Sequence, residues 1–343
     1  MLPHKIKALW EQCKSKSNIL FKSIKEQTDN YSDVSFYIAI ICICSFIILY
    51  YPVGAILTNN INRNLDIKID KISPNQSMAI DMVSHLINEE VNEKIWTPNL
   101  PFFFPAAILD NMPNYQLGIL NSLSKFTSAL EKSNHKKTKD EEKTNRLYRA
   151  TVLLRYPGTI WMFDSHNKIK PVPSASSQYR KARRLLKKYN HSLITGDETF
   201  TKSPQNLAFI LQKSNLNLKQ SEMQITSSIR ENSKDWFDFK ADDIFYYNQG
   251  KLYAYYLLFR ALGDDYKKII VDNNQYQNWI TLIKALEDAV LVQPSIVSNG
   301  NLSGSVTPNH LAYLNAYILK AQNILAQMII QFNKTSSSIK DSK

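Results

Sequence analysis

Asp81, His85 and Glu89 are spaced at i, i+4 and i+8, so a helix would place an imidazole between two carboxylates on one face. Such a face can ligate a metal ion or move a proton. The same spacing is also typical of a solvated helix face whose charges pair with their neighbours. We favour the solvated face, and we therefore predict no metal site and no cofactor.

Two further groups of acids stand at predicted helix starts. Asp110 and Asn111 precede Pro113, and Asp242 is followed by Asp243. Carboxylates at a helix N-terminus are first of all caps, because they interact favourably with the positive end of the helix. If the fold brings Asp110 and Asp242 into one cleft, they become candidates for acid–base catalysis. Asp110 and Asn111 are therefore candidate binding residues.

No sequence motif supports a particular reaction. HExxH, CxxC and GxSxG are absent, which disfavours zinc hydrolases, thiol oxidoreductases and serine hydrolases. The chain has 8 glycines in 343 residues and no glycine-rich phosphate loop, so a nucleotide-binding α/β fold is disfavoured as well. We expect a protein without catalytic activity. The alternative is an enzyme or small-ligand-binding protein that uses carboxylates in a helical cleft.

A strongly basic helix is predicted over residues 176–193. It carries six positive charges, Arg180, Lys181, Arg183, Arg184, Lys187 and Lys188. Cations at this density suit the phosphate or carboxylate groups of a partner, and Arg180, Arg183, Arg184 and Lys187 are our candidate binding residues. The alternative is a solvated face that acids elsewhere in the fold neutralise.

The most unusual stretch is WTPNLPFFFPAAILDNMPNYQ, residues 96–116. Its prolines exclude one continuous helix, and the run Phe102, Phe103 and Phe104 is atypical of a solvent-facing loop. We expect a buried turn that plugs the domain, since aromatic-rich segments usually pack. A groove floor, a partner-docking surface and a wedge that touches lipid are the alternatives. In each of these alternatives the three phenylalanines are binding residues.

The elements that must position these residues begin with an uncharged apolar run from Phe36 to Leu57. A helix over residues 36–57 would span roughly the 30 Å hydrocarbon core of a bilayer, so we predict a membrane anchor with the lipid bilayer as its partner. Lysines precede the run, which predicts a cytoplasmic, basic, amphipathic segment over residues 1–35 and a translocated carboxyl-terminal part. A cleaved signal peptide is the alternative, because Gly54 and Ala55 are small.

A mainly α fold is predicted beyond the anchor, with at most one or two short strands. A linker over residues 58–72 leads to one helical bundle over residues 73–334, and a disordered tail covers residues 335–343. About seven or eight helices follow from apolar periodicity and from proline, glycine and serine signals. Ser73 and Gln76, for example, form a capping box that would open the first of these helices.

Residues 236–259 are exceptionally aromatic and predict the central helix of the bundle. Side chains this large fill the space between several helices. Gly250 within this helix would permit close packing with a neighbour, and Gly263 would end the helix.

The charge of the chain limits its partners. Lys and Arg number 42 against 30 Asp and Glu, which gives a net charge of +12. A basic domain outside the cytoplasm attracts acidic partners or anionic head groups. We expect no nucleic acid partner in that compartment, and we expect an envelope protein or an anionic polymer instead. The alternative is that the charge only keeps the domain soluble.

Six blocks of residues occur in a familiar order: YPVGA, WTPNxPFFxP, LDNMPNYQLG, YPGTIWMFD, QYRKARRLLKKYN and DDIFYYNQGKLYAYYLLFRALG. From Tyr51 to about Asp264 the chain resembles an uncharacterised family of bacterial inner-membrane proteins, domain of unknown function 2333. The resemblance implies a bacterial, single-pass protein whose domain is periplasmic, and it supplies no catalytic residues. We therefore expect a non-catalytic scaffold or partner-docking module of the cell envelope, acting through the basic helix and the phenylalanine segment.

Overall fold

The computed structural model describes residues 11, 15–19, 33–61, 63–134, 145–163, 170–232, 239–294, 297 and 309–341. Within these residues the regular elements are helices, and no strand is present. The predicted mainly α class is therefore confirmed. The chain divides into two compact units, Met1–Leu57 and Thr58–Lys343.

The first unit contains most of helix α2 (Asp33–Thr58). The segment Tyr37–Thr58 of this helix has 22 residues and is long and apolar enough to cross a membrane. The predicted apolar helix is confirmed at nearly the same bounds. Its orientation stays a prediction, and most of the expected amphipathic segment over residues 1–35 lies outside the described residues.

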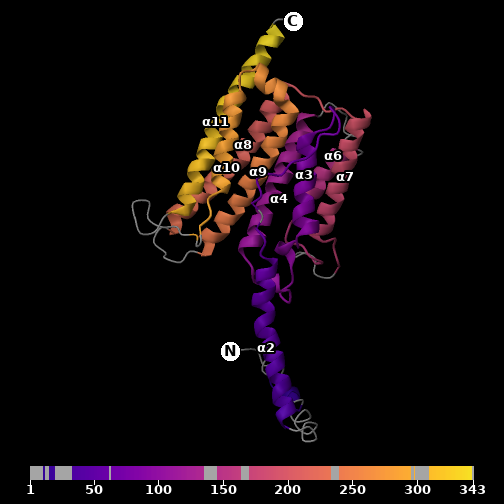
Figure 1. The fold of residues 1–343 in the computed structure, drawn as a ribbon, viewed down its shortest axis with the longest axis vertical. Coiled ribbons are helices and arrows are strands. Elements are labelled where there is room, and N and C mark those ends of the chain that lie inside the picture. Colours follow the sequence, from indigo (N-terminus) through magenta and orange to yellow (C-terminus); the bar gives the residue numbers. More distant parts are fainter. Residues whose placement is uncertain are drawn as a thin grey trace. The chain divides into compact units, whose positions relative to one another are not determined.

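The second unit is a bundle of long helices (Figure 1). Its α-helices are α3 (Met78–Asn88), α4 (Asn111–Ser133), α6 (Arg146–Leu154), α7 (Ala175–Thr195), α8 (Pro204–Asn232), α9 (Phe239–Asp272), α10 (Tyr276–Val290) and α11 (His310–Asp341). A π-helix, η1 (Glu89–Glu93), continues α3. Two 3₁₀ turns, η2 (Thr97–Asn99) and η3 (Pro105–Ile108), connect it to α4.

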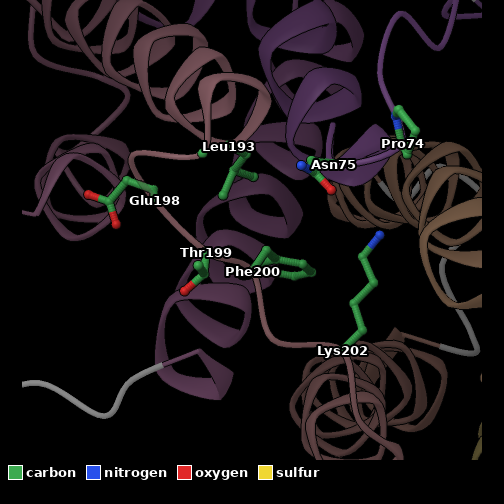
Figure 2. A pocket seen from close by; sticks show the side chains of 8 residues that line it. Pro74, Asn75, Leu193, Glu198, Thr199, Phe200 and Lys202 are labelled. Atoms are coloured by element: carbon green, nitrogen blue, oxygen red, sulfur yellow. The ribbon is translucent and has the colours of Figure 1, made fainter.

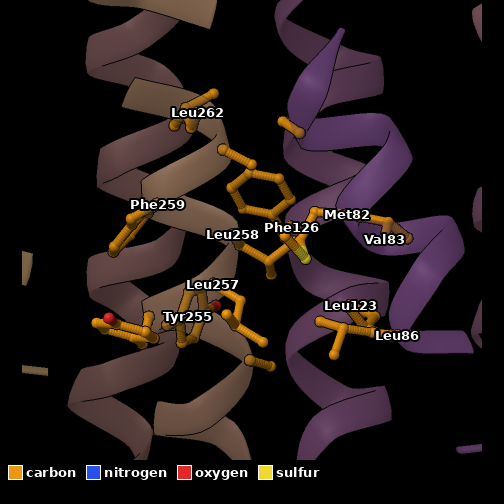
Figure 3. Packing of buried hydrophobic residues seen from close by; sticks show 14 of the residues in the cluster. Met82, Val83, Leu86, Leu123, Phe126, Tyr255, Leu257, Leu258, Phe259 and Leu262 are labelled. Atoms are coloured by element: carbon orange, nitrogen blue, oxygen red, sulfur yellow. The ribbon is translucent and has the colours of Figure 1, made fainter. Parts of the chain in front are cut away.

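Helix α9 is the centre of the bundle and packs against α3, α4, α8, α10 and α11. The ring of Phe259 contacts the rings of Tyr255, Trp279 and Phe126, with centroids 5.4, 6.1 and 6.4 Å apart. Leu258 of α9 and Phe126 of α4 belong to the same buried core (Figure 3). The predicted central aromatic helix is confirmed from Phe239 onward, and residues 236–238 lie outside the described residues.

Helices α4 and α9 approach each other closely enough that neither can carry a side chain at the crossing. A Cβ atom on Gly118 would lie 1.9 Å from the carbonyl oxygen of Tyr247, and one on Gly250 would lie 2.1 Å from the carbonyl oxygen of Tyr115. Both glycines are needed because backbone faces backbone at this contact. The expectation that Gly250 permits close packing is met.

The prediction that Gly263 ends the central helix is wrong. Helix α9 passes through Gly263 and continues to Asp272. The helical path ends just beyond it, at Asn274, which has a left-handed φ of 55°. A Cβ on Gly263 would lie 2.5 Å from Nε1 of Trp279 in α10. This glycine therefore makes room for a neighbouring ring within the helix.

Two other helix boundaries differ from expectation. Ser77, and not Ser73, is the N-cap of α3, and its side chain accepts a hydrogen bond from the N–H of Ile80. The side chain of Gln76 accepts from the backbone of Ser73, so it stabilises the turn before the helix. At the carboxyl end, α11 extends to Asp341, where a disordered tail is predicted.

The linker is extended and packs against the second unit. Ile61, Leu65, Ile67 and Ile69 are partly buried against the core. The hydroxyl of Tyr253 in α9 donates to the linker backbone at a distance of 3.2 Å. The linker is therefore held along α9.

The expectation of a buried phenylalanine turn is also wrong. Phe102, Phe103 and Phe104 are 83, 48 and 38% exposed. Trp96 packs into the domain instead. Its side chain is 4% exposed, and its indole N–H donates to the carbonyl of Gly158. Tyr115, near the end of the segment, is fully buried as well. Composition alone did not show which of the five rings would turn inward.

Candidate functional site

A groove of about 540 Å³ between α6 and α7 is the candidate functional site, called the α6–α7 groove below. Arg149 of α6 and Lys181, Arg184 and Lys188 of α7 line it. The three α7 residues follow one another at i, i+3 and i+7, which places them on one stripe of the helix. Within the described residues, none of these four cations forms an ion pair. The groove therefore holds four positive charges without a carboxylate of its own.

The floor of the α6–α7 groove is apolar. Val152 and Leu153 of α6 and Leu185 of α7 form it, and Val152 is 47% exposed. Tyr148 and Gln178 complete the lining. An apolar floor below a cationic rim favours a ligand that combines acidic and apolar groups.

Local capping sets the positions of the two helices. Asn145 caps α6 by accepting from the N–H of Leu147 at 2.8 Å, and Ser174 caps α7. Gly196, with a φ of 84°, ends α7 in the left-handed conformation. The hydroxyl of Tyr179 donates to the carbonyl of Tyr156 at 2.7 Å and ties α7 to the end of α6. The groove is thus built on two fixed helices.

The predicted basic residues divide between two faces of α7. Arg184 lines the groove, whereas Arg180, Arg183 and Lys187 do not. The guanidinium of Arg180 donates two hydrogen bonds, of 3.0 and 3.1 Å, to the end of η1 and so has a structural role. Arg149 was missed because it comes from another helix.

The structure brings the predicted acids Asp110 and Asp242 close together, with Asp243, in what we call the acidic cluster. Asn111 hydrogen-bonds Asp242, and the side-chain amide of Asn114 donates to Asp243 at 2.7 Å. Burial, followed by the charges of Asp110 and Asp243, raises the pKa of Asp242 to about 6. A carboxyl group with this pKa can exchange a proton near neutral pH.

The stripe of Asp81, His85 and Glu89 is divided in the structure. Asp81 accepts a hydrogen bond from the side-chain amide of Gln76, while Glu89 lies 3.0 Å from the ammonium of Lys94. His85 and Glu89 line a cavity of about 590 Å³ beside the linker. No group of three metal-ligating side chains occurs within the described residues.

Lys251 of α9 is a buried cation that sequence reasoning missed. Its ammonium donates to the carbonyl of Asn217 and to the hydroxyl of Ser221, at 3.1 and 2.6 Å. Burial, together with the charge of Lys125, lowers the pKa of Lys251 to about 7. The residue is 3% exposed, so it acts first as a link between α9 and α8.

A cavity of about 440 Å³ lies where α7 ends and α3 begins. Figure 2 shows Lys202 extending from the segment before α8 toward Asn75. The ammonium of Lys202 also lies 3.7 Å from Asp265, which binds the N-terminus of α3. This cavity adjoins a buried structural contact, and the α6–α7 groove remains the better candidate site.

In the part of the chain that the structure describes, the protein is all-α and carries one helix apolar enough to cross a membrane. Residues 99–220 and 204–331 match a family described as "Uncharacterized protein conserved in bacteria (DUF2333)". The chain belongs to this bacterial family, as its residue blocks indicated, and the match extends beyond Asp264 to residue 331. No curated protein matches the chain, and no solved structure does.

Proposed function

We propose that this protein is a non-catalytic docking module of the bacterial cell envelope, which holds an acidic segment of a partner protein in the α6–α7 groove. The observation that carries the proposal is the set of four cations, Arg149, Lys181, Arg184 and Lys188, above an apolar floor. Without a carboxylate of their own, these cations attract an acidic partner and speed its association.

An acidic protein segment fits the groove better than an anionic polymer does. Exposed ion pairs contribute only about 0.2–1 kcal/mol each to binding. The cations therefore mainly speed the approach of an acidic partner and set its position along the groove. Val152, Leu153 and Leu185 can add affinity only if the ligand also carries apolar side chains. An amphipathic protein segment offers both, whereas a phosphate or sugar polymer offers only charge.

The location of this module in the cell is a further part of the proposal. We propose that α2 spans the inner membrane, with the amino-terminal segment in the cytoplasm and the helical domain in the periplasm. The lysines at positions 5, 7, 14, 16, 22 and 25, ahead of the apolar run, support this orientation. The uncharged segment Tyr37–Thr58 supports the membrane span.

Reversal of three groove charges tests the docking function. In the full-length chain, Arg149→Glu, Arg184→Glu and Lys188→Glu are combined, and a photo-crosslinking amino acid replaces Gln178 in the groove. We expect the unmodified groove to capture a segment rich in acidic residues. A synthetic peptide of that segment should bind the charge-reversed chain at least tenfold more weakly, which is about 1.4 kcal/mol.

A matched control changes the same number of charges elsewhere. Lys187, Lys219 and Lys267 are exposed and do not line the groove, so their replacement by glutamate should leave peptide binding within about twofold. Equal losses in both variants would show that net charge, not the groove, attracts the partner. Capture of a segment without acidic residues would contradict the proposal.

The acidic cluster favours a second candidate function, an envelope enzyme or small-ligand-binding protein. Its support is the pKa of about 6 at Asp242, which belongs to a carboxylate held close to Asp110. Carboxylates with a raised pKa at functional sites are retained although they lower the stability of the fold. The loss of stability that Asp242 causes can be measured.

Asp242→Asn should stabilise the domain near neutral pH. The folded state binds the Asp242 proton more tightly than the unfolded state, whose pKa is near 3.8, so stability falls as pH rises from 4 to 6. The shift of about two units corresponds to at most about 3 kcal/mol. Because Asp242 is half-exposed, we expect a gain of about 1 kcal/mol at pH 7 and none at pH 4.

Urea unfolding of the full-length chain in detergent, followed at pH 4 and pH 7, measures this effect. Asp264→Asn on the exposed side of the same helix is the control and should change stability little. If Asp242→Asn is destabilising at pH 7, its carboxylate serves as a structural link and the second function loses its support.

A further inference from the structure

Two loops of the second unit display six large apolar side chains that are exposed in the described fold. We call them the aromatic patch: Phe102, Phe103, Phe104, Trp161, Met162 and Phe163. All six are exposed, and the rings of Phe103 and Trp161 meet edge to face with centroids 6.1 Å apart. A contiguous patch of this kind marks an interaction surface.

Partly buried polar contacts hold the two loops of the aromatic patch together. The indole N–H of Trp96 donates to the carbonyl of Gly158 at 2.9 Å, and the side-chain amide of Asn99 donates to the carbonyl of Ile160 at 2.8 Å. Trp96 and Asn99 are only 4 and 8% exposed. Trp96 and Asn99 are thus buried and hydrogen-bonded, while the six side chains of the aromatic patch stay exposed on the same two loops. The fold therefore holds the patch at the surface.

The aromatic patch lies at the end of the second unit where the chain enters it. Asn60 and Asn64 of the linker line one cavity together with Glu93 and Lys94. Lys94 stands two residues before Trp96, which supports the patch. The linker also accepts a hydrogen bond from Tyr253 of α9, so it is attached to the bundle. The residues that join this unit to the apolar helix and those that display the patch therefore share one end of the bundle.

We propose that the aromatic patch inserts into the membrane interface and forms a second contact with the bilayer, in addition to that of α2. The proposal rests on the membrane anchoring proposed above. Trp, Phe and Met are side chains that partition into the interfacial region of a bilayer. A unit tethered at this end meets lipid at a high effective concentration. A bilayer thus fits the patch better than a soluble partner.

Nitroxide labels in the full-length chain test the contact. Cys13, Cys42 and Cys44 are changed to serine, and Phe102→Cys carries the label, because this side chain is the most exposed of the patch. The protein is placed in vesicles of phosphatidylethanolamine and phosphatidylglycerol. The label's collisions with oxygen, which concentrates in lipid, are compared with its collisions with a water-soluble nickel complex.

A matched label at Val271→Cys reports on the far end of α9. Val271 is also exposed and apolar, and it lies about 45 Å along the helix from Asp242. The charge of Asp110, just after the phenylalanine segment, acts on Asp242, so the start of α9 lies near that segment. We expect oxygen to dominate at Phe102→Cys and the nickel complex to dominate at Val271→Cys. Changing Trp161 and Met162 to glutamine should shift the Phe102→Cys label toward water.

A separate chain that keeps only Cys44, within α2, distinguishes the two proposals. If its label lies in lipid while the Phe102→Cys label is as water-accessible as the Val271→Cys label, the anchor stands and the second contact is refuted. If the Cys44 label is itself in water, the anchoring fails and the second contact fails with it. A Phe102→Cys label shielded from both reagents would show a protein neighbour and would also overturn the proposal.

Discussion

Replacing Gly250 by alanine is expected to lower the free energy of unfolding by about 3 kcal/mol, the upper end for an overpacked core. The new Cβ would lie 2.1 Å from the carbonyl oxygen of Tyr115, so α4 and α9 must separate. Alanine normally favours a helix over glycine by about 1 kcal/mol. The clash outweighs this gain, because the obstructing atom belongs to a helix backbone and cannot rotate away.

Gly263→Ala in the same helix is the matched control. There the new Cβ would meet the ring of Trp279 at 2.5 Å, which is a side chain that can shift. We expect a loss of about 1 kcal/mol, measured by urea unfolding of the full-length chain in detergent. Equal effects at Gly250 and Gly263 would mean that the α4–α9 crossing relaxes easily, contrary to this account.

The double variant Gly118→Ala, Gly250→Ala adds a second check. Gly118 faces the carbonyl of Tyr247 across the same crossing. Once one methyl group has moved the helices apart, the second meets less resistance, so the two losses should be less than additive. Additive losses would indicate that the two contacts yield separately.

Proline and glycine marked helix boundaries where they act locally: Pro204 begins α8, and Gly196 ends α7. Serine was a weaker signal, because Ser77 and not Ser73 caps α3. Gly263 misled the prediction, since a glycine can end a helix or make room for a neighbour, and only the packing of Trp279 decides between these roles. Local signals therefore predicted some helix boundaries, and the packing of neighbouring elements decided the others.

The candidate site was only partly predictable, because it depends on contacts between distant residues. The density of charge on α7 was plain in the sequence, but Arg149 must come from α6 to complete the rim. Conversely, Asp110 and Asp242 lie in different parts of the chain, and the close crossing of α4 and α9 brings their helix starts together. Sequence identified the residue types, and packing selected the partners.

The exposed phenylalanines also could not be predicted from the sequence. Composition indicated that residues 96–116 must pack, and Trp96 does pack, at 4% exposure. The three phenylalanines remain outside because Pro101 and Pro105 flank them in a tight turn that continues into η3. A pattern rule that counts aromatic residues cannot distinguish the buried ring from the displayed ones.

Asp265→Ala is expected to cost about 3–5 kcal/mol, as is typical when one member of a buried charged network is removed. Asp265 of α9 accepts three hydrogen bonds at the start of α3: from the hydroxyl of Ser77 at 2.8 Å and from the N–H groups of Met78 and Ala79 at 3.0 and 3.1 Å. Burial raises the pKa of Asp265, and the charge of Lys202 opposes the rise. One carboxylate thus caps a helix from outside it.

The loss should be large because the donors left behind stay buried. Ser77 is fully buried, and its backbone is also held by Asn190 of α7, which accepts from the Ser77 N–H at 2.9 Å. Water therefore cannot replace the missing carboxylate without opening the α3–α7–α9 contact. We expect the start of α3 to lose its protection against amide hydrogen exchange before the rest of the bundle does.

Asp264→Ala provides the matched control, since Asp264 is the exposed neighbour of Asp265 on the same helix. It should change the free energy of unfolding by less than about 0.5 kcal/mol. Asp265→Asn, which keeps one acceptor oxygen, should fall between the two alanine variants in urea unfolding of the full-length chain. If Asp265→Ala were as mild as Asp264→Ala, the N–H groups of Met78 and Ala79 would have to find other acceptors, and α3 would not depend on α9 for its cap.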